Sequence, residues 1–217
     1  MDHKHMSLAD HIFERLENDI LCGKYQKGEL LTETKLSSEL GVSRTPIREA
    51  LHRLAAEHLI EDTPKGSLVI GMTAEGVRDI LFIRTRLEGE CAARAAERIT
   101  DEELSQLREV LDLQEFYFSK GDPEHIRSMD SRFHELFYKF SGSSVFLETL
   151  LPLHKKIQKY RRVSVSDTSR AEKSVIEHRK IFDAIAAHDA DAARLYTEEH
   201  VRNAMKSISK SDKSELA

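Results

Sequence analysis

Four side chains in the second half of the chain have the chemistry of metal ligands: Asp130, His134, His178 and His200. Asp130 and His134 are four residues apart, so they project from one face of a helix and can bind the same ion. The other two histidines fall on later helical segments, and facing helices of an antiparallel bundle build metal sites in their core. Three imidazoles and one carboxylate suit Zn²⁺ or Ni²⁺.

The competing interpretation is that these histidines are ordinary surface or hydrogen-bonded residues. The chain has 11 histidines, and most must belong to that class. We assign three others to it: His125, His154 and His188.

A second group of candidate functional residues lies in the segment Gly41 to Leu51, GVSRTPIREAL. Arg44 and Arg48 are one helical turn apart, and a guanidinium can bond a guanine edge bidentately or clamp a phosphate. Ser43 is expected to cap their helix, its hydroxyl accepting from the amides of the first turn. The opening glycine can end a preceding helix over residues 32–40. This pattern indicates a helix-turn-helix, whose second helix enters the major groove; the alternative is a solvated helix face.

Two short apolar runs, Leu59-Ile60 and Leu68 to Ile70, favour a β-hairpin after this helix. Pro64 and Gly66, between the runs, predict its turn. Lys65 and Gly66 at the tip can approach a phosphate or the minor groove, Gly66 because it has no side chain to obstruct the backbone. The hairpin is therefore expected to act as a wing.

The rest of the sequence predicts helices almost throughout. One is expected at residues 7–21, and beyond Thr73 we expect helices at about 73–98, 101–120, 123–140, 144–164, 168–188 and 191–210. Pro152 predicts a kink or break in the fourth of these. The fold class is mostly α: an N-terminal winged helix-turn-helix with a small β-hairpin (residues 1–72), then an all-α antiparallel helical bundle (residues 73–217).

Composition supports a globular, two-domain protein of 217 residues with a net charge of −5. Residues 1–72 hold 9 basic and 12 acidic side chains, a net charge of −3, so any attraction to DNA must come from a focused patch. Cys22 and Cys91 are distant singletons, no apolar signal core opens the chain, and no apolar run reaches membrane-spanning length. We therefore expect a cytoplasmic protein with no membrane partner.

The segment from about Ser7 to Ile70, with GVSRTPIREAL inside it, resembles the winged helix of the GntR family of bacterial transcription regulators. The resemblance implies that Arg44, Thr45 and Arg48 contact DNA. Some members carry an arginine where this chain has Thr34, so Lys35 is expected to supply that contact. The expected DNA-binding residues are Lys35, Ser43, Arg44, Thr45, Arg48, Lys65 and Gly66.

Residues 73 to about 209 resemble the FCD ligand-binding domain of the FadR-like subfamily, through MDSRFHELF, EHRKIFDAI and EEHVRNA. Members with this pattern hold a metal through the aspartate and three histidines and leave positions for water or an organic acid. Arg84, in a stretch resembling the subfamily's RxxLE, is expected to reach the effector's carboxylate; the alternative is a surface salt bridge with Glu88. Asn203 is a weaker effector-binding candidate, or it hydrogen-bonds a neighbouring helix.

These features together predict a homodimeric, ligand-responsive regulator that reads a palindromic DNA operator and binds a divalent metal and a small carboxylate. Three alternatives remain: a sensor of the metal itself, a metal-dependent hydrolase, and a metal-free cavity for an acyl chain. The sequence does not identify the effector, the operator and regulated genes, the sign of regulation, or the ion.

Overall fold

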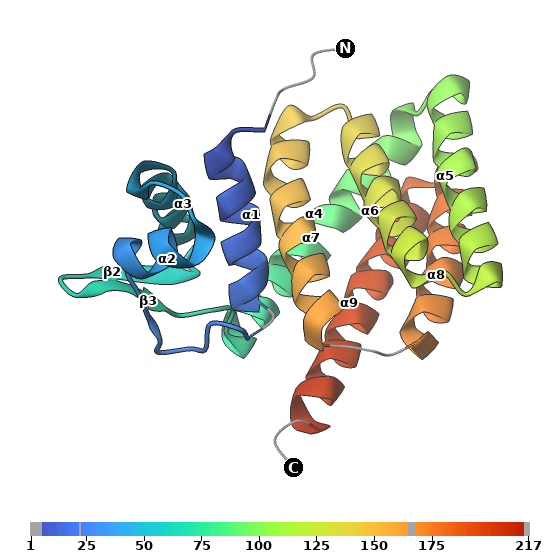
Figure 1. Cartoon of the computed structure of the whole chain (residues 1–217). Coiled ribbons are helices and arrows are strands. Elements are labelled where there is room, and N and C mark those ends of the chain that lie inside the picture. The colour runs from blue at the N-terminus through green and yellow to red at the C-terminus, as the bar shows by residue number, and fades with distance from the viewer. Residues whose placement is uncertain (1–5, 22, 165–167, 215–217) are drawn as a thin grey trace. The chain divides into compact units, whose positions relative to one another are not determined.

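The computed structural model describes residues 6–21, 23–164 and 168–214, and it divides the chain into two compact units, Met1–Ala74 and Glu75–Ala217 (Figure 1). Both units are mainly helical, and a small antiparallel sheet belongs to the first. The expected fold class is confirmed. Cys22 lies outside the described residues.

The N-terminal unit contains the expected helix-turn-helix. Its elements are α1 (Leu8–Leu21), β1 (Leu30–Leu31), α2 (Glu33–Leu40), α3 (Arg44–Ala56), β2 (Ile60–Thr63) and β3 (Gly66–Val69). The Thr32 side chain accepts from the Lys35 amide and so caps α2, and Gly41 ends that helix with a φ of 68°. Helix α1 packs on α3, and buried side chains such as Leu16 and Ile47 fill the core between the elements of this unit.

The wing has one strand more than the sequence predicted. The strand order is β1-β3-β2, with Leu30 opposite Leu68 and Thr63 opposite Gly66. The hairpin turn therefore consists of Pro64 and Lys65 alone, and Gly66 already belongs to β3. The predicted Pro64 lies in the turn, whereas Gly66 does not, because the strands extend beyond the apolar runs and pair Thr63 with Gly66.

The C-terminal unit is an all-helical bundle. Its helices are α4 (Ala74–Arg98), α5 (Asp101–Lys120), α6 (Pro123–Phe140), α7 (Ser144–Ser164), α8 (Thr168–Ala186) and α9 (Ala190–Ser214). The predicted capping box at Thr100 and Glu103 opens α5, and the predicted Asp122 cap opens α6. Helix α5 packs on α6 and α8, and α8 packs on α9 (Figure 1).

Helix α7 continues through Pro152, so of the two expected outcomes, a kink or a break, the break does not occur and the kink stays a prediction. The apolar core of the bundle draws on α4 to α9, and its fully buried side chains include Phe133, Phe137 and Leu150. Burial raises the pKa of the Cys91 thiol in this core to about 12, so that this cysteine remains a packed thiol rather than a reactive thiolate.

Candidate metal centre and nucleic-acid interface

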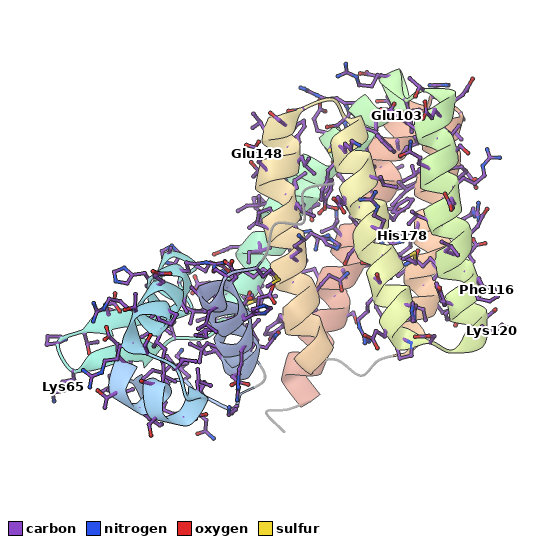
Figure 2. The ribbon with its side chains drawn as sticks, turned by 45° about the horizontal axis from the view of Figure 1, so that its top comes forward. Lys65, Glu103, Phe116, Lys120, Glu148 and His178 are labelled. Atoms are coloured by element: carbon purple, nitrogen blue, oxygen red, sulfur yellow. The ribbon has the colours of Figure 1, made fainter. Side chains whose placement is uncertain are left out.

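Three of the four predicted ligands meet inside the C-terminal bundle. His134 of α6, His178 of α8 and His200 of α9 each offer a ring nitrogen, and these atoms lie within 4.8 Å of one another. The Nε2 atoms of His178 and His200 are 3.4 Å apart. All three side chains are buried, and Figure 2 shows His178 among the bundle helices rather than on the outer face.

Asp130, the fourth predicted ligand, lies beside this histidine cluster. Its Oδ1 atom is 3.7 Å from Nε2 of His178. Ser174 donates to the same oxygen at 3.2 Å, and the Gln158 amide donates to the other carboxylate oxygen. Asp130 is 7% exposed, so its charge faces the histidines rather than the solvent.

The other nitrogen of each imidazole faces an oxygen acceptor. The Nδ1 atoms of His178 and His200 are within hydrogen-bond distance of Gln114 Oε1 (2.9 Å) and Glu177 Oε2 (2.8 Å). Nδ1 of His134 lies 3.2 Å from Glu88 Oε2, but the angle at this contact is not that of a hydrogen bond. An acceptor at Nδ1 favours the tautomer with the proton on Nδ1, which leaves the Nε2 lone pair available. Acceptors placed behind imidazoles in this way orient them as metal ligands.

The protonation states also fit a metal site. Burial lowers the pKa of His178 to about 3, and burial together with the neighbouring cationic groups lowers the pKa of His200 well below its ordinary value. Neutral imidazole is the form that binds metal ions. Nε2 of His134 is buried and has no hydrogen-bond partner within the described part of the chain, which is costly unless a ligand occupies its lone pair.

Arg84 forms the salt bridge with Glu88 that the sequence offered as an alternative, but the pair is buried rather than on the surface. Their side chains are 5% and 0% exposed, and Nε of Arg84 donates to Glu88 Oε1, which also accepts from the Tyr138 hydroxyl at 2.7 Å. Burial is the largest single influence and raises the pKa of Glu88, but the neighbouring Arg84 and His134 together outweigh it, and the pKa falls to about 2.

His154, which the sequence analysis placed with the surface or hydrogen-bonded histidines, is hydrogen-bonded, but it lies inside the bundle beside the histidine cluster. It is 1% exposed, and its ring centroid lies 4.3 Å from that of His134. Its Nδ1 is 3.0 Å from a terminal nitrogen of Arg84, and its Nε2 is 3.7 Å from Asp130 Oδ2. Helical spacing from buried Leu150 and Ile157 was the signal that would have placed it inside.

His154, Glu88 and His134 form a second group of possible ligands within 4.8 Å of one another. The guanidinium of Arg84 contacts both Glu88 and His154, and a cation in that position opposes the binding of another. The first histidine cluster is therefore the better metal site.

Arg170 of α8 is a second buried cation that the sequence analysis missed. It is 3% exposed, and one terminal nitrogen lies 2.7 Å from Glu177 Oε2 while the other lies 3.3 Å from the His200 carbonyl oxygen. Its Nε has no hydrogen-bond partner among the residues that the structure describes. No motif marked this arginine, since its role depends on the register of α8 against α9.

Asn203 makes the hydrogen bond to a neighbouring helix that the sequence offered as its alternative role. Its amide donates to Glu177 Oε1 at 2.9 Å. Asn203 and Glu177 also line a groove between α8 and α9, together with Lys173, Ile176, Lys180, Tyr196 and Glu199. The groove has a volume of about 190 Å³.

In the N-terminal unit, α3 exposes the side chains of Arg44, Thr45 and Arg48. Arg48 makes a bidentate contact with Glu33 of α2, at 2.7 and 2.8 Å. Ser43 occupies the N-cap position as predicted, but its side chain makes no capping hydrogen bond, so that detail of the prediction was wrong. The hydroxyl of Ser43 is on an exposed residue at the start of α3.

The remaining expected DNA contacts lie on α2 and the wing. Lys35 pairs with Glu29 at 2.9 Å, and Lys65 is exposed at the hairpin tip (Figure 2). Gly66 has a φ of 134°, and a Cβ there would lie 2.6 Å from the Leu31 carbonyl oxygen. The position requires glycine because β1 packs against it, which is a different reason from the one that the sequence suggested.

Comparisons with known proteins match both units. A family described as "Bacterial regulatory proteins, gntR family" matches residues 8–70, and one described as "FCD domain" matches residues 79–203. The chain is 31% identical to the HTH-type transcriptional regulator YdhC of Bacillus subtilis, over 87% of this chain and 85% of YdhC. It is 29% identical to the HTH-type transcriptional repressor RspR of Escherichia coli, over 91% of this chain and 87% of RspR.

Among solved structures, Escherichia coli McbR/YncC superposes with a TM-score of 0.73 at 23% identity, covering 94% of this chain and 98% of McbR. This similarity establishes a shared fold. Across the described part of the chain, no helix is both long and apolar enough to span a bilayer.

Proposed function

Because the chain belongs to the GntR family of bacterial transcription regulators and carries an FCD ligand-binding domain, we propose that it is a cytoplasmic, homodimeric repressor controlled by a metal-associated carboxylate effector. The observation that carries this proposal is the convergence of three buried imidazoles, one of which, His134, has an Nε2 atom with no hydrogen-bond partner among the described residues. The related regulator RspR is named a repressor, which supports that sign of regulation. The matched relatives are regulators and not enzymes, so the hydrolase alternative is dropped.

The proposed ion is held by four residues: Asp130, His134, His178 and His200. Imidazole and carboxylate donors suit a divalent ion of borderline softness, and Zn²⁺ or Ni²⁺ fits this set best. When bound, such an ion supplies positive charge and coordination positions for an acid's oxygens. The surrounding residues orient the imidazoles and exclude water from them.

The effector proposed for this site is a small organic acid. Arg84 and Arg170 place two guanidinium groups around the histidine cluster, and both are buried. A carboxylate effector would bind Arg84 while Arg84 still contacts Glu88. Asn203, which lines the groove between α8 and α9, is proposed as a further effector contact. A guanidinium is the side chain best suited to bidentate recognition of a carboxylate.

On the DNA side, we propose that two winged helices of a homodimer read the two halves of a palindromic operator. The exposed side chains of Arg44, Thr45 and Arg48 are positioned for base or phosphate contacts from α3. The additional proposed contacts are Lys35, Ser43, Lys65 and Gly66. Effector binding weakens operator affinity only as far as the operator weakens effector affinity.

Zinc binding tests the metal half of this proposal. Chelator-stripped protein is titrated with Zn²⁺ in a competition assay, and the parent is compared with the triple variant His134→Ala, His178→Ala, His200→Ala. The parent is expected to bind one ion per chain and the triple variant none with comparable affinity. Equal, weak binding by both proteins overturns the metal site.

The regulatory half is tested by measuring operator affinity with zinc alone and with zinc plus a panel of small carboxylic acids, on a duplex selected from a random library. Release of DNA only when both are present supports a carboxylate effector. Release by zinc alone identifies a metal sensor. Replacing both Arg44 and Arg48 by alanine should cost at least tenfold in operator affinity, whereas Arg15→Ala removes one positive charge from α1 and serves as the control for each single replacement.

A further inference from the structure

The carboxylate of Glu177 joins three groups around His200. Its Oε2 lies 2.8 Å from Nδ1 of His200 and 2.7 Å from a terminal nitrogen of Arg170, and its Oε1 accepts from the Asn203 amide at 2.9 Å. Glu177 precedes His178 on α8, while His200 and Asn203 are on α9. One side chain therefore connects the two helices that contribute these histidines.

Glu177 differs from the other two acceptors behind the histidine cluster. The side chain of Glu88 is fully buried and Gln114 is 0% exposed. The Glu177 side chain is 17% exposed and lines the groove between α8 and α9. Its contact with His200 is thus the one of the three that lies at the boundary between the buried cluster and the surface.

Two groups compete for Nδ1 of His200. Besides Glu177, a terminal nitrogen of Arg170 lies 3.4 Å from this atom. A guanidinium only donates hydrogen bonds. If Arg170 were the sole partner, Nδ1 would have to accept, and the ring proton would move to Nε2. An imidazole protonated on Nε2 cannot ligate an ion through that nitrogen.

We propose that Glu177 is a positioning residue that keeps the His200 proton on Nδ1 against the competing Arg170, and thereby sets the affinity of the histidine cluster for a divalent ion. The inference rests on the proposed metal site. Under this proposal, loss of Glu177 lowers the affinity for the ion, whereas loss of its ion-pair partner Arg170 does not. If the ion pair only held α8 and α9 together, loss of either residue would have the same effect.

The test measures Zn²⁺ affinity of the full-length chain by chelator competition. Glu177→Met leaves a buried arginine without its carboxylate and risks misfolding, so the central comparison is Arg170→Met against the double variant Arg170→Met, Glu177→Met. Both lack the buried guanidinium and differ only at Glu177. Arg170→Met is expected to bind zinc as tightly as the parent or more tightly, and the double variant 10- to 100-fold more weakly than Arg170→Met. Where Glu177→Met folds, it should bind more weakly still.

Two controls separate the possible failures. Glu172→Met removes an exposed carboxylate from the same helix and should change zinc affinity less than threefold, and thermal unfolding in chelator reports whether each variant is folded. Affinities within threefold for Arg170→Met and the double variant overturn the role of Glu177, and so does loss of binding in Arg170→Met alone. Failure of the parent to bind zinc refutes the metal site instead.

Discussion

Replacement of Arg84 by methionine should destabilise the C-terminal bundle far more than loss of a surface ion pair would. Arg84 and Glu88 are 5% and 0% exposed in their side chains, so the substitution leaves a carboxylate buried without its cation. Breaking a buried pair from one side costs about 3–5 kcal/mol. Glu88 keeps the Tyr138 hydroxyl at 2.7 Å and the His134 ring at 3.2 Å, so we expect the lower end, about 3 kcal/mol.

The assay is urea unfolding followed by circular dichroism, in chelator and at one protein concentration. The matched control is Arg202→Met, which removes the cation of an ion pair with Glu198 that has the same four-residue helical spacing but lies on the surface of α9, with Arg202 44% exposed. That change should cost no more than about 1 kcal/mol. If Arg84→Met and Arg202→Met lower the free energy of unfolding equally, Glu88 is not held as a buried charge and the reasoning fails.

Three further outcomes are expected. Burial holds the folded-state pKa of His178 at about 3, below the ordinary 6.5. The contribution of this histidine to the free energy of unfolding is therefore complete above pH 6.5 and is lost as the pH falls. Urea unfolding in chelator should show a loss of up to about 1.4 kcal/mol per pH unit, and a flat profile from pH 6.5 to 4 would contradict this expectation. Gly66→Ala should destabilise the N-terminal unit by at least about 2 kcal/mol in thermal or urea unfolding. The control Gly23→Ala should cost less, because none of the described atoms lies within 4 Å of the new Cβ there. Equal losses of stability in the two variants would refute the packing argument. Glu33→Gln should raise operator affinity in an anisotropy titration, because it releases Arg48; weaker binding would count against Arg48 as a DNA contact.

The parts of the fold that sequence could predict are those set by local chemistry. The Thr100 capping box, the Asp122 cap followed by proline, and the Gly41 turn each act within a few residues, and each occurs where the sequence indicated it. The three predicted histidine ligands also came together. Their positions follow from which face of each helix is apolar, and that pattern is local too.

The features that sequence reasoning missed depend on long-range packing. Strand β1 has two residues and exists because β3 pairs with it. Arg170 belongs to no quoted motif, and Glu177 opens EHRKIFDAI, but that motif drew attention only to His178. His154 was different, because its helical spacing from buried apolar residues was visible but was given too little weight. Pro152 does not end its helix, because a proline removes one hydrogen bond of the helix and the packing around it can hold the rest together.

The ion pair between Arg48 and Glu33 affects how the DNA affinity of the N-terminal unit would depend on ionic strength. A free arginine that meets DNA displaces counterions condensed on the phosphates, and the gain is lost as salt rises. When Arg48 exchanges Glu33 for a DNA phosphate, the carboxylate of Glu33 loses its cation and binds another from solution. This uptake of a cation offsets part of the counterion release from the DNA. We therefore expect a shallower logarithmic dependence of affinity on salt than the number of arginine and lysine contacts alone would give.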